Sequence, residues 1–340
     1  MRNIIPLILV IIIWANTTSA QLVKGVNLVG PFDQSRNETT ISELVDLNAE
    51  WVCLLPEVTL DRVSLKLESP ENENWSISES SCRKLIQECK KKGLKVLIKP
   101  HLVLSKKISP SDKVKQKSDW RGNINFKNEL DWQQLEKEYL DFILGWAQLA
   151  TDENANALFI GTELKSFVKK RPHFWNELIT KVSQVYKGPL SYSANWDNFN
   201  NIGFWQRLHF IGINSYFPIS LQTVPSISQT KSNWVSLQET LSDFAINQKK
   251  KILLTEFGYR NIEQAGKEPW LHVSQTNSNL NNISQYNLLS AFFESIWQED
   301  YIIGGLLWNW TQKPPKDGNI DFSIQNKPTE QLVRDWYSRD

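Results

Sequence analysis

Eight short apolar runs are spaced along the chain, and most are continuous rather than alternating. Continuous runs of about four to eight residues are typical of strands that are buried on both faces, as in a parallel sheet. The pattern therefore predicts an α/β architecture with a parallel sheet at its centre. The predicted strands are Gly25–Gly30, Trp51–Pro56, Lys95–Pro100, Ala157–Glu163, Leu190–Asn195, Phe210–Asn214, Ile252–Glu256 and Gly304–Trp308.

Segments with apolar residues at helical spacing separate most of these runs. They predict helices at Ser78–Lys92, Glu129–Ala150, Phe174–Lys187, Trp234–Gln248, Ile283–Gln298 and Glu330–Trp336, with room for only one or two turns at Phe204–Leu208. Strands alternating with helices over 340 residues predict a single-domain (β/α)8 TIM barrel. An open doubly wound sheet is the alternative, but no Gly-x-Gly-x-x-Gly motif follows the first strand. Two long polar insertions, Leu60–Trp75 and Ser105–Asn128, follow the second and third strands and would lie at the catalytic face.

The start of the chain has the pattern of an export signal. A basic residue, Arg2, precedes the apolar run Ile4–Trp14, and Thr18–Ala20 ends on small residues. The run is short for a membrane span, so we predict a signal peptide at residues 1–20 and a mature domain at residues 21–340. An uncleaved N-terminal anchor is the alternative. We expect a secreted or periplasmic monomer that is not membrane-bound after cleavage.

Charge and cysteine usage exclude several classes of function. Lys and Arg number 38 and Asp and Glu 37, so the balance predicts no polyanion-binding surface and no nucleic-acid partner. No metal-ligand spacing occurs among the three cysteines and four histidines, and we expect neither a metal nor an organic cofactor. Cys82 and Cys89 are seven residues apart on a predicted helix, about 10 Å of rise, which is too far for a disulfide. Cys53 is predicted to be a core residue.

Two carboxylates end two of the predicted strands. Glu163 closes the fourth strand and Glu256 closes the seventh. A barrel places its chemistry at the carboxyl ends of its strands, and a charged residue is unusual at the end of an apolar run unless it is paired or functional. A salt bridge at the barrel rim would explain either residue alone. The two together favour a pair of catalytic carboxylates.

The strings around these residues resemble a known group of enzymes. Gly161–Leu164 (GTEL) and Thr255–Arg260 (TEFGYR) resemble the clan A glycoside hydrolases, and more narrowly family 113, a family of β-mannanases. The resemblance implies that Glu163 is the general acid/base and Glu256 the nucleophile of a retaining hydrolase. That reaction needs one neutral and one ionised carboxyl group across the scissile bond. Thr162 stands where many clan members have Asn, so the contact to the sugar 2-hydroxyl must differ or come from elsewhere.

Other strand ends supply candidate substrate-binding residues. The resemblance implies that Tyr216 orients the nucleophile and that Trp308 forms the floor under the cleaved sugar. Hydroxyl-binding and ring-stacking side chains suit a pyranose, which has an apolar face and polar edges, although ordinary packing is the alternative for the aromatic residues. The candidates are His101, Asn195, Trp196, Asn214, Tyr216, Trp308 and Trp310.

Two basic residues are candidates to interact with the predicted catalytic carboxylates. Lys99 ends a buried run and should pair with a carboxylate or reach a hydroxyl, and Arg260 could keep Glu256 ionised or form a rim ion pair. The sequence therefore predicts a retaining endo-β-1,4-glycanase, most similar to β-mannanases, acting on a polysaccharide or oligosaccharide. A different β-glycanase, an exo-acting glycosidase and a non-catalytic carbohydrate-binding barrel are the alternatives.

Overall fold

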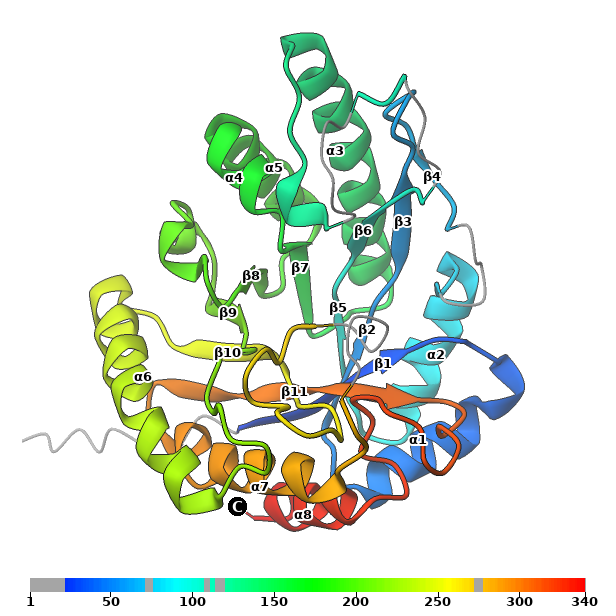
Figure 1. The fold of residues 1–340 in the computed structure, drawn as a ribbon. Helices are drawn as coiled ribbons and strands as arrows, with labels where there is room; N and C mark the ends of the chain where they lie inside the picture. The colour runs from blue at the N-terminus through cyan, green and yellow to red at the C-terminus, as the bar shows by residue number, and fades with distance from the viewer. Residues whose placement is uncertain (1–21, 71–75, 107–110, 114–119, 272–277, 340) are drawn as a thin grey trace, which may run out of the picture.

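Eight parallel strands close into a barrel at the centre of the molecule (Figure 1). The computed structural model describes residues 22–70, 76–106, 111–113, 120–271 and 278–339, so the predicted signal peptide lies outside the described residues. The barrel strands are β1 (Val23–Val29), β2 (Trp51–Leu54), β5 (Lys95–Ile98), β7 (Ala157–Thr162), β8 (Leu190–Asn195), β9 (Ile211–Asn214), β10 (Ile252–Phe257) and β11 (Ile302–Thr311). Their order around the barrel is β1-β11-β10-β9-β8-β7-β5-β2. The predicted (β/α)8 fold is confirmed, and the open sheet is wrong.

Helices cover the outside of the barrel (Figure 1). They are α1 (Asn37–Asp46), α2 (Glu79–Lys91), α3 (Glu129–Asp152), α4 (Lys165–Lys170), α5 (Pro172–Val185), α6 (Ile227–Gln248), α7 (Asn282–Phe293) and α8 (Pro328–Tyr337). Short 3₁₀ turns add η1 (Gln34–Arg36), η3 (Arg121–Asn123), η4 (Phe199–Asn201), η5 (Trp205–Arg207) and η7 (Ile296–Gln298). No helix in the described part of the chain combines the length and apolar character that a membrane span requires.

All six predicted helices are present, and the differences lie at their ends. Two helices, α1 and α4, were not predicted; in α1 the buried apolar side chains are only Ile41 and Leu44, too few for a clear periodic stripe. Helix α6 begins earlier than predicted because the Ser226 side chain caps it, accepting a hydrogen bond from the Gln229 amide. Only η4 and η5 connect β8 to β9, as the short spacing predicted.

The chain after β2 and β5 departs from prediction. It does not enter loops directly but continues as strands β3 (Glu57–Leu60) and β6 (His101–Leu104), which pair in parallel and, with β4 (Leu67–Glu68), form a separate three-stranded sheet. Pro56 and Pro100 separate these strands from the barrel because proline cannot donate a ladder hydrogen bond. The small sheet extends beyond the barrel beside α3 (Figure 1). The predicted insertions therefore begin farther from the barrel than expected.

Apolar side chains from several strands fill the inside of the barrel. This inner cluster consists of Val23, Cys53, Leu97, Ala157, Phe159, Leu253 and Leu306. A second and larger cluster packs the helices against the outer face of the strands. All three cysteines are buried and free, which confirms that Cys82 and Cys89 are not bridged.

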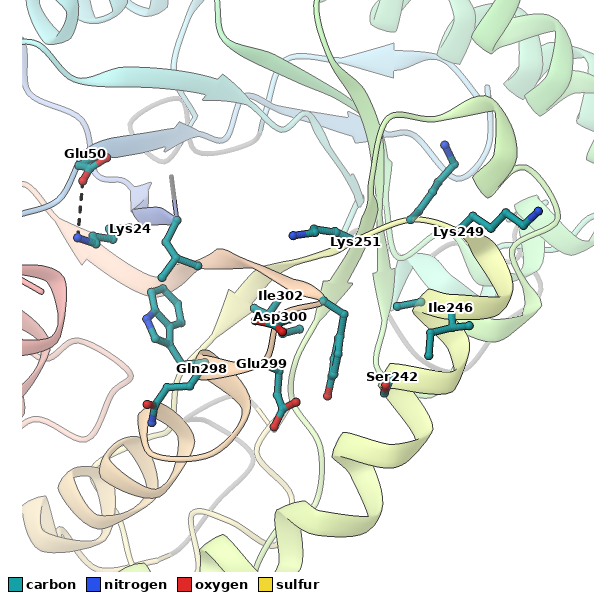
Figure 2. Close-up of a pocket in the computed structure, with 15 residues that line it drawn as sticks. Lys24, Glu50, Ser242, Ile246, Lys249, Lys251, Gln298, Glu299, Asp300 and Ile302 are labelled. Atoms are coloured by element: carbon teal, nitrogen blue, oxygen red, sulfur yellow. Dashed lines mark ion pairs between the residues drawn. The ribbon is translucent and has the colours of Figure 1, made fainter. Parts of the chain in front are cut away.

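A hollow of about 1020 Å³ lies at the amino-terminal end of the barrel (Figure 2). Its lining includes Lys24 near the start of β1, Lys251 just before β10 and Ile302 at the start of β11. Lys24 is paired with Glu50 on one side of this hollow, at 3.8 Å between Nζ and Oε1. Because strands in a barrel carry their chemistry at the opposite end, we assign this hollow no part in a reaction.

Candidate active site

A β-bulge turns Glu256 toward the inside of the barrel. Leu253 belongs to the inner cluster, so strict alternation along β10 would direct Glu256 outward, toward the helices. The pairing with β9 shifts register between Leu254 and Glu256, which adds one residue on β10 and reverses the alternation. The Glu256 side chain is thus at the carboxyl end of the barrel and buried, with 5% of the residue exposed.

Two donors hold the Glu256 carboxylate. Lys99 Nζ lies 2.7 Å from Oε1, and the Tyr216 hydroxyl donates to Oε2 at 2.9 Å. Lys99 is wholly buried and also donates to the Thr255 carbonyl oxygen at 3.1 Å. Lys99 follows Leu97 of the inner cluster by two residues, so both side chains point to the inside of the barrel. The structure therefore pairs Lys99 with a carboxylate and brings Tyr216 to the predicted nucleophile.

Opposing effects set the charge of Glu256. Burial raises its pKa, the Lys99 ammonium lowers it, and the nearby charge of Glu163 raises it. Burial and the neighbouring Glu256 charge raise the pKa of Tyr216 well above its ordinary value. Tyr216 therefore keeps its proton and serves as a donor, and Lys99 is the main group that favours the ionised form of Glu256.

Glu163 follows β7 in a left-handed backbone conformation, with φ of 56°. Such a conformation is uncommon for a residue other than glycine or asparagine, and strained residues of this kind cluster at active sites. The Glu163 amide donates to the Ser193 carbonyl oxygen at 2.9 Å, which ties this residue to β8. The neighbouring Thr162 is buried, and its hydroxyl has no hydrogen-bond partner among the described residues.

Asn214 connects the two predicted catalytic strands. Its side-chain amide donates to Glu163 Oε1 at 3.0 Å, and its Oδ1 accepts from Ser193 Oγ at 2.7 Å and Thr255 Oγ1 at 2.8 Å. Its backbone is paired with Glu256 across β9 and β10. Asn214 is wholly buried and its amide is bonded to the Glu163 carboxylate; a contact between Asn214 and the substrate stays a prediction.

Residues of the second insertion reach the other side of Glu163. Trp120 Nε1 donates to Oε2 at 3.3 Å, and Arg121 Nε lies 3.8 Å from the same oxygen. Neither residue was predicted, because a loop residue carries no periodic signal of what it will face. The only sequence signal is their place in a segment that follows the third strand, where a barrel has its catalytic loops.

His101 and Trp308 lie together beside Lys99. Their rings are nearly parallel, with centroids 6.4 Å apart, and Lys99 Nζ lies 5.6 Å from the Trp308 ring centroid. Burial and the cations Arg121 and Lys99 hold the pKa of His101 well below its usual range, so the imidazole is neutral. The buried His101 Nε2 has no hydrogen-bond partner among the described residues. A neutral imidazole nitrogen next to an aromatic face is suited to a sugar hydroxyl.

A second aromatic pair lies at the end of β8. Trp196 stacks on Trp270, with ring centroids 5.0 Å apart and 25° between the planes. Trp270 is 40% exposed and was not predicted, because it belongs to a loop without local pattern. Asn195, next to Trp196, donates from Nδ2 to Asp197 Oδ1 at 3.0 Å, so its amide is engaged at the rim.

The structure does not bring Trp310 to these residues. The pairing of β11 with β1 shifts register between Val26 and Leu28, and the extra residue on β11 separates the directions of Trp308 and Trp310. Trp310 is 2% exposed and shares its surroundings with Glu43 of α1 and Arg334 of α8. The prediction that Trp310 stacks on a sugar is therefore corrected: it packs between the barrel and the outer helices.

Arg260 lies near the site without pairing with the nucleophile. It is 2% exposed, its Nη2 donates to the Glu268 carbonyl oxygen at 3.0 Å, and its guanidinium lies 5.9 Å from the Phe322 ring centroid. Burial lowers the pKa of Arg260. Phe322 also packs edge-on against Tyr216, with centroids 6.0 Å apart. Lys99, rather than Arg260, is thus the cation at Glu256.

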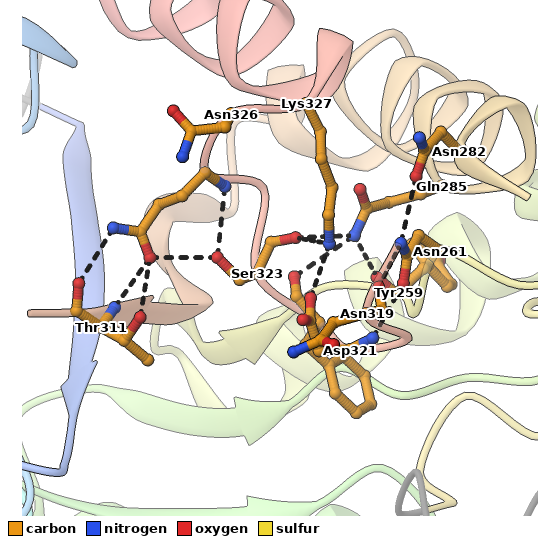
Figure 3. A network of polar contacts seen from close by, with 12 residues as sticks. Tyr259, Asn261, Asn282, Gln285, Thr311, Asn319, Asp321, Ser323, Asn326 and Lys327 are labelled. Atoms are coloured by element: carbon orange, nitrogen blue, oxygen red, sulfur yellow. Dashed lines mark hydrogen bonds and ion pairs between the residues drawn. The ribbon is translucent and has the colours of Figure 1, made fainter. Parts of the chain in front are cut away.

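A polar network fixes the loop that carries Phe322 (Figure 3). Gln285 Nε2 on α7 donates to the carbonyl oxygens of Tyr259 and Phe322, at 2.9 and 3.3 Å. Lys327 Nζ lies 2.6 Å from Asp321 Oδ1 and donates to the Ser323 carbonyl oxygen, also at 2.6 Å. These bonds join the loops after β10 and β11, so the aromatic neighbour of Tyr216 is held by both.

The fold and the paired carboxylates define the class of protein. Two strand-end Glu residues joined through Asn214 at the carboxyl end of a (β/α)8 barrel are the arrangement of a glycoside hydrolase. In the described part of the chain, no group of three or more His, Cys, Asp or Glu side chains is arranged to hold a metal ion. The chain belongs to Glycoside Hydrolase Family 113, whose family model matches residues 25–327.

Solved structures share the fold over nearly the whole chain. The GH113 β-mannanase AaManA from Alicyclobacillus acidocaldarius, in complex with ManMIm, is 20% identical, with 94% of this chain and 97% of that chain covered and a TM-score of 0.79. A GH113 β-1,4-mannanase is 19% identical, with coverages of 94% and 100% and a TM-score of 0.78. The Ruminococcus gnavus β-glucuronidase is 12% identical, with coverages of 94% and 50% and a TM-score of 0.65. Among curated protein sequences, none matches this chain.

Proposed function

We propose that the protein is a retaining endo-β-1,4-mannanase. The observation that carries the proposal is the pair of carboxylates, Glu163 and Glu256, each held by its own donors and joined through Asn214. Family membership and the likeness to GH113 β-mannanases support the choice of mannan. A carbohydrate-binding barrel would not need a buried ammonium paired with a buried carboxylate.

The environments of the two carboxylates favour different roles. Glu256 is bonded to Lys99 and Tyr216, so its ionised form is stabilised and its oxygen can attack the anomeric carbon. Glu163 donates its proton to the leaving glycosidic oxygen as that bond breaks, and the sugar becomes esterified to Glu256. Esterification removes the Glu256 charge. Glu163, now ionised, takes a proton from water, whose oxygen attacks the same carbon and releases Glu256 as a carboxylate.

The remaining predicted residues fit sugar recognition. His101 and Trp308 lie next to Lys99 and would contact the sugar that is attacked, with the unpartnered His101 Nε2 bonding to one of its hydroxyls. The stacked pair of Trp196 and Trp270 offers an exposed aromatic face for a further pyranose of the chain. A row of such contacts suits a polysaccharide better than a small glycoside.

The test is a reducing-sugar assay on mannan, glucomannan, xylan and cellulose, with product stereochemistry followed by NMR. We expect release of internal fragments from mannan with retained configuration, and loss of cleavage in Glu163→Gln and Glu256→Gln. Inverted product would refute double displacement. Persistent cleavage in either purified variant would refute the assignment of the two carboxylates, and binding of mannan without cleavage would favour the carbohydrate-binding alternative.

We also infer that the protein is exported and loses residues 1–20. The support is the sequence alone: a basic start, a short apolar run and small residues before Gln21. Mass spectrometry of the protein purified from its native host should give an N-terminus at Gln21. A chain that retains Ile4–Trp14 in the membrane fraction would support the uncleaved anchor instead.

A further inference from the structure

The Glu163 carboxylate is held from two sides by separate parts of the chain. From the barrel, Asn214 donates to Oε1 at 3.0 Å; from the insertion, Trp120 donates to Oε2 at 3.3 Å and Arg121 Nε lies 3.8 Å away. We propose that Trp120, with Arg121 beside it, is a positioning residue that aims the Glu163 carboxyl group at the leaving glycosidic oxygen. The inference rests on the proposed hydrolase chemistry and extends it to this loop.

The chain around Trp120 is built to present the indole at this place. The ring lies against Gly122, where a Cβ atom would collide with it. The turn η3 that follows packs against α4 and β6, and Ile124 and Phe126 behind it are buried, with 0% and 5% exposed. Helix α4 itself starts two residues after Glu163. The loop is therefore anchored to the helix that begins directly after the acid/base.

The chemistry of the donors suits a residue that must gain and lose a proton. A carboxylate has about four acceptor positions, so hydrogen bonds from Asn214 and Trp120 leave positions free for the substrate. An indole N–H only donates, so Trp120 can orient Glu163 without competing for its proton. Glu256 is held in the same manner by one cation and one neutral donor, Lys99 and Tyr216.

The test compares substrates that differ in their need for an acid. Trp120→Phe keeps an aromatic ring but removes the N–H donor, and kcat/KM is measured with mannopentaose and with 2,4-dinitrophenyl β-mannobioside. The first leaving group departs only with a proton, and the second departs without one. We expect kcat/KM to fall about 10-fold or more with mannopentaose and to change less than about two-fold with the dinitrophenyl substrate.

A second variant displaces the indole without changing it. Gly122→Ala places a methyl group against the Trp120 ring, so it should show the same selective loss. Trp146→Phe is the matched control, because Trp146 lies on α3 and packs on Phe142, and it should keep both rates. Glu163→Gln serves as the reference: it shows how much more kcat/KM falls with mannopentaose than with the dinitrophenyl substrate when the acid itself is lost.

The pattern across the variants decides the outcome. Equal losses on both substrates in Trp120→Phe would mean that the indole only supports the fold, and no loss on either would mean that its bond to Glu163 is idle; both results overturn the proposal. If Glu163→Gln itself lost activity equally on both substrates, the acid/base assignment would fail and the proposed function with it. If only Glu163→Gln lost kcat/KM selectively with mannopentaose, the proposed hydrolase function would stand and only the role of Trp120 would be refuted.

Discussion

Replacing Lys99 with methionine tests the electrostatics of the nucleophile directly. The Lys99 ammonium is wholly buried and lies 2.7 Å from Glu256 Oε1. Methionine has a similar unbranched shape without the charge, so the substitution removes the ion pair with little change in packed volume. Removing one partner of a buried ion pair costs about 3–5 kcal/mol, because the other charge is left uncompensated.

The direction of the effect follows from the causes that set the pKa of Glu256. Burial and the charge of Glu163 raise this pKa, and Lys99 is the main group that lowers it. Without Lys99 the pKa of Glu256 rises further, so a smaller fraction of the nucleophile is ionised at any given pH. Because an uncompensated buried charge is costly, removal of the Lys99 ammonium should raise the pKa of Glu256 clearly.

The assay is the pH dependence of kcat/KM on mannan oligosaccharides. The acidic limb of the Lys99→Met profile should move to higher pH, with activity partly regained as the pH rises. Lys95→Met is the matched control: it lies on the same strand at the far end of the barrel, where Lys95 Nζ is 5.0 Å from the Trp51 ring centroid. Its profile should match that of the unmodified protein.

Two results would refute this reasoning. An acidic limb that coincides with that of the unmodified protein would show that Lys99 does not set the ionisation of Glu256. A loss of activity by the same factor at every pH would show that Lys99 acts on the shape of the site rather than on its charge.

Three further predictions concern single features of the structure. Tyr216→Phe removes the donor to Glu256 and should lower kcat/KM about 10- to 150-fold, by the usual worth of a hydrogen bond to a charged group; an unchanged rate would contradict the contact. Trp310→Phe should lower the free energy of unfolding by about 1–2 kcal/mol in chemical denaturation and leave KM and kcat unchanged, because the ring packs outside the site; a raised KM would restore the predicted sugar contact. Dithiothreitol should leave the melting temperature unchanged because the cysteines are free, and a clear drop would reveal a disulfide.

The fold was predictable because it is encoded locally. Strands buried on both faces need continuous apolar runs, and each of the eight runs became a barrel strand. The ends of those runs identified Glu163 and Glu256, since a barrel gathers its strand ends at one mouth. Helix α1 was missed because its apolar stripe is short, and β3 and β6 were missed because prolines made the preceding runs look complete.

The contacts at the site were not predictable from the same pattern. Strand alternation alone would direct Glu256 outward and treat Trp308 and Trp310 alike, but register shifts in β10 and β11 reverse these directions. Asn214 is predicted to meet the substrate, but the strand pattern does not predict the bond that its amide makes to Glu163. Trp120 and Arg121 reach that carboxylate from a segment with no periodicity at all.

The sequence by itself determined a barrel with two acidic residues at its mouth, because apolar periodicity and strand order are properties of neighbouring residues in the chain. Only the tertiary structure decided which donors meet each acidic residue. Lys99 and Glu256 are far apart in sequence, and their bond exists because closure of the barrel brings β5 and β10 to the same interior. Burial there removes competing water, and it makes that one contact decisive for the charge of the nucleophile.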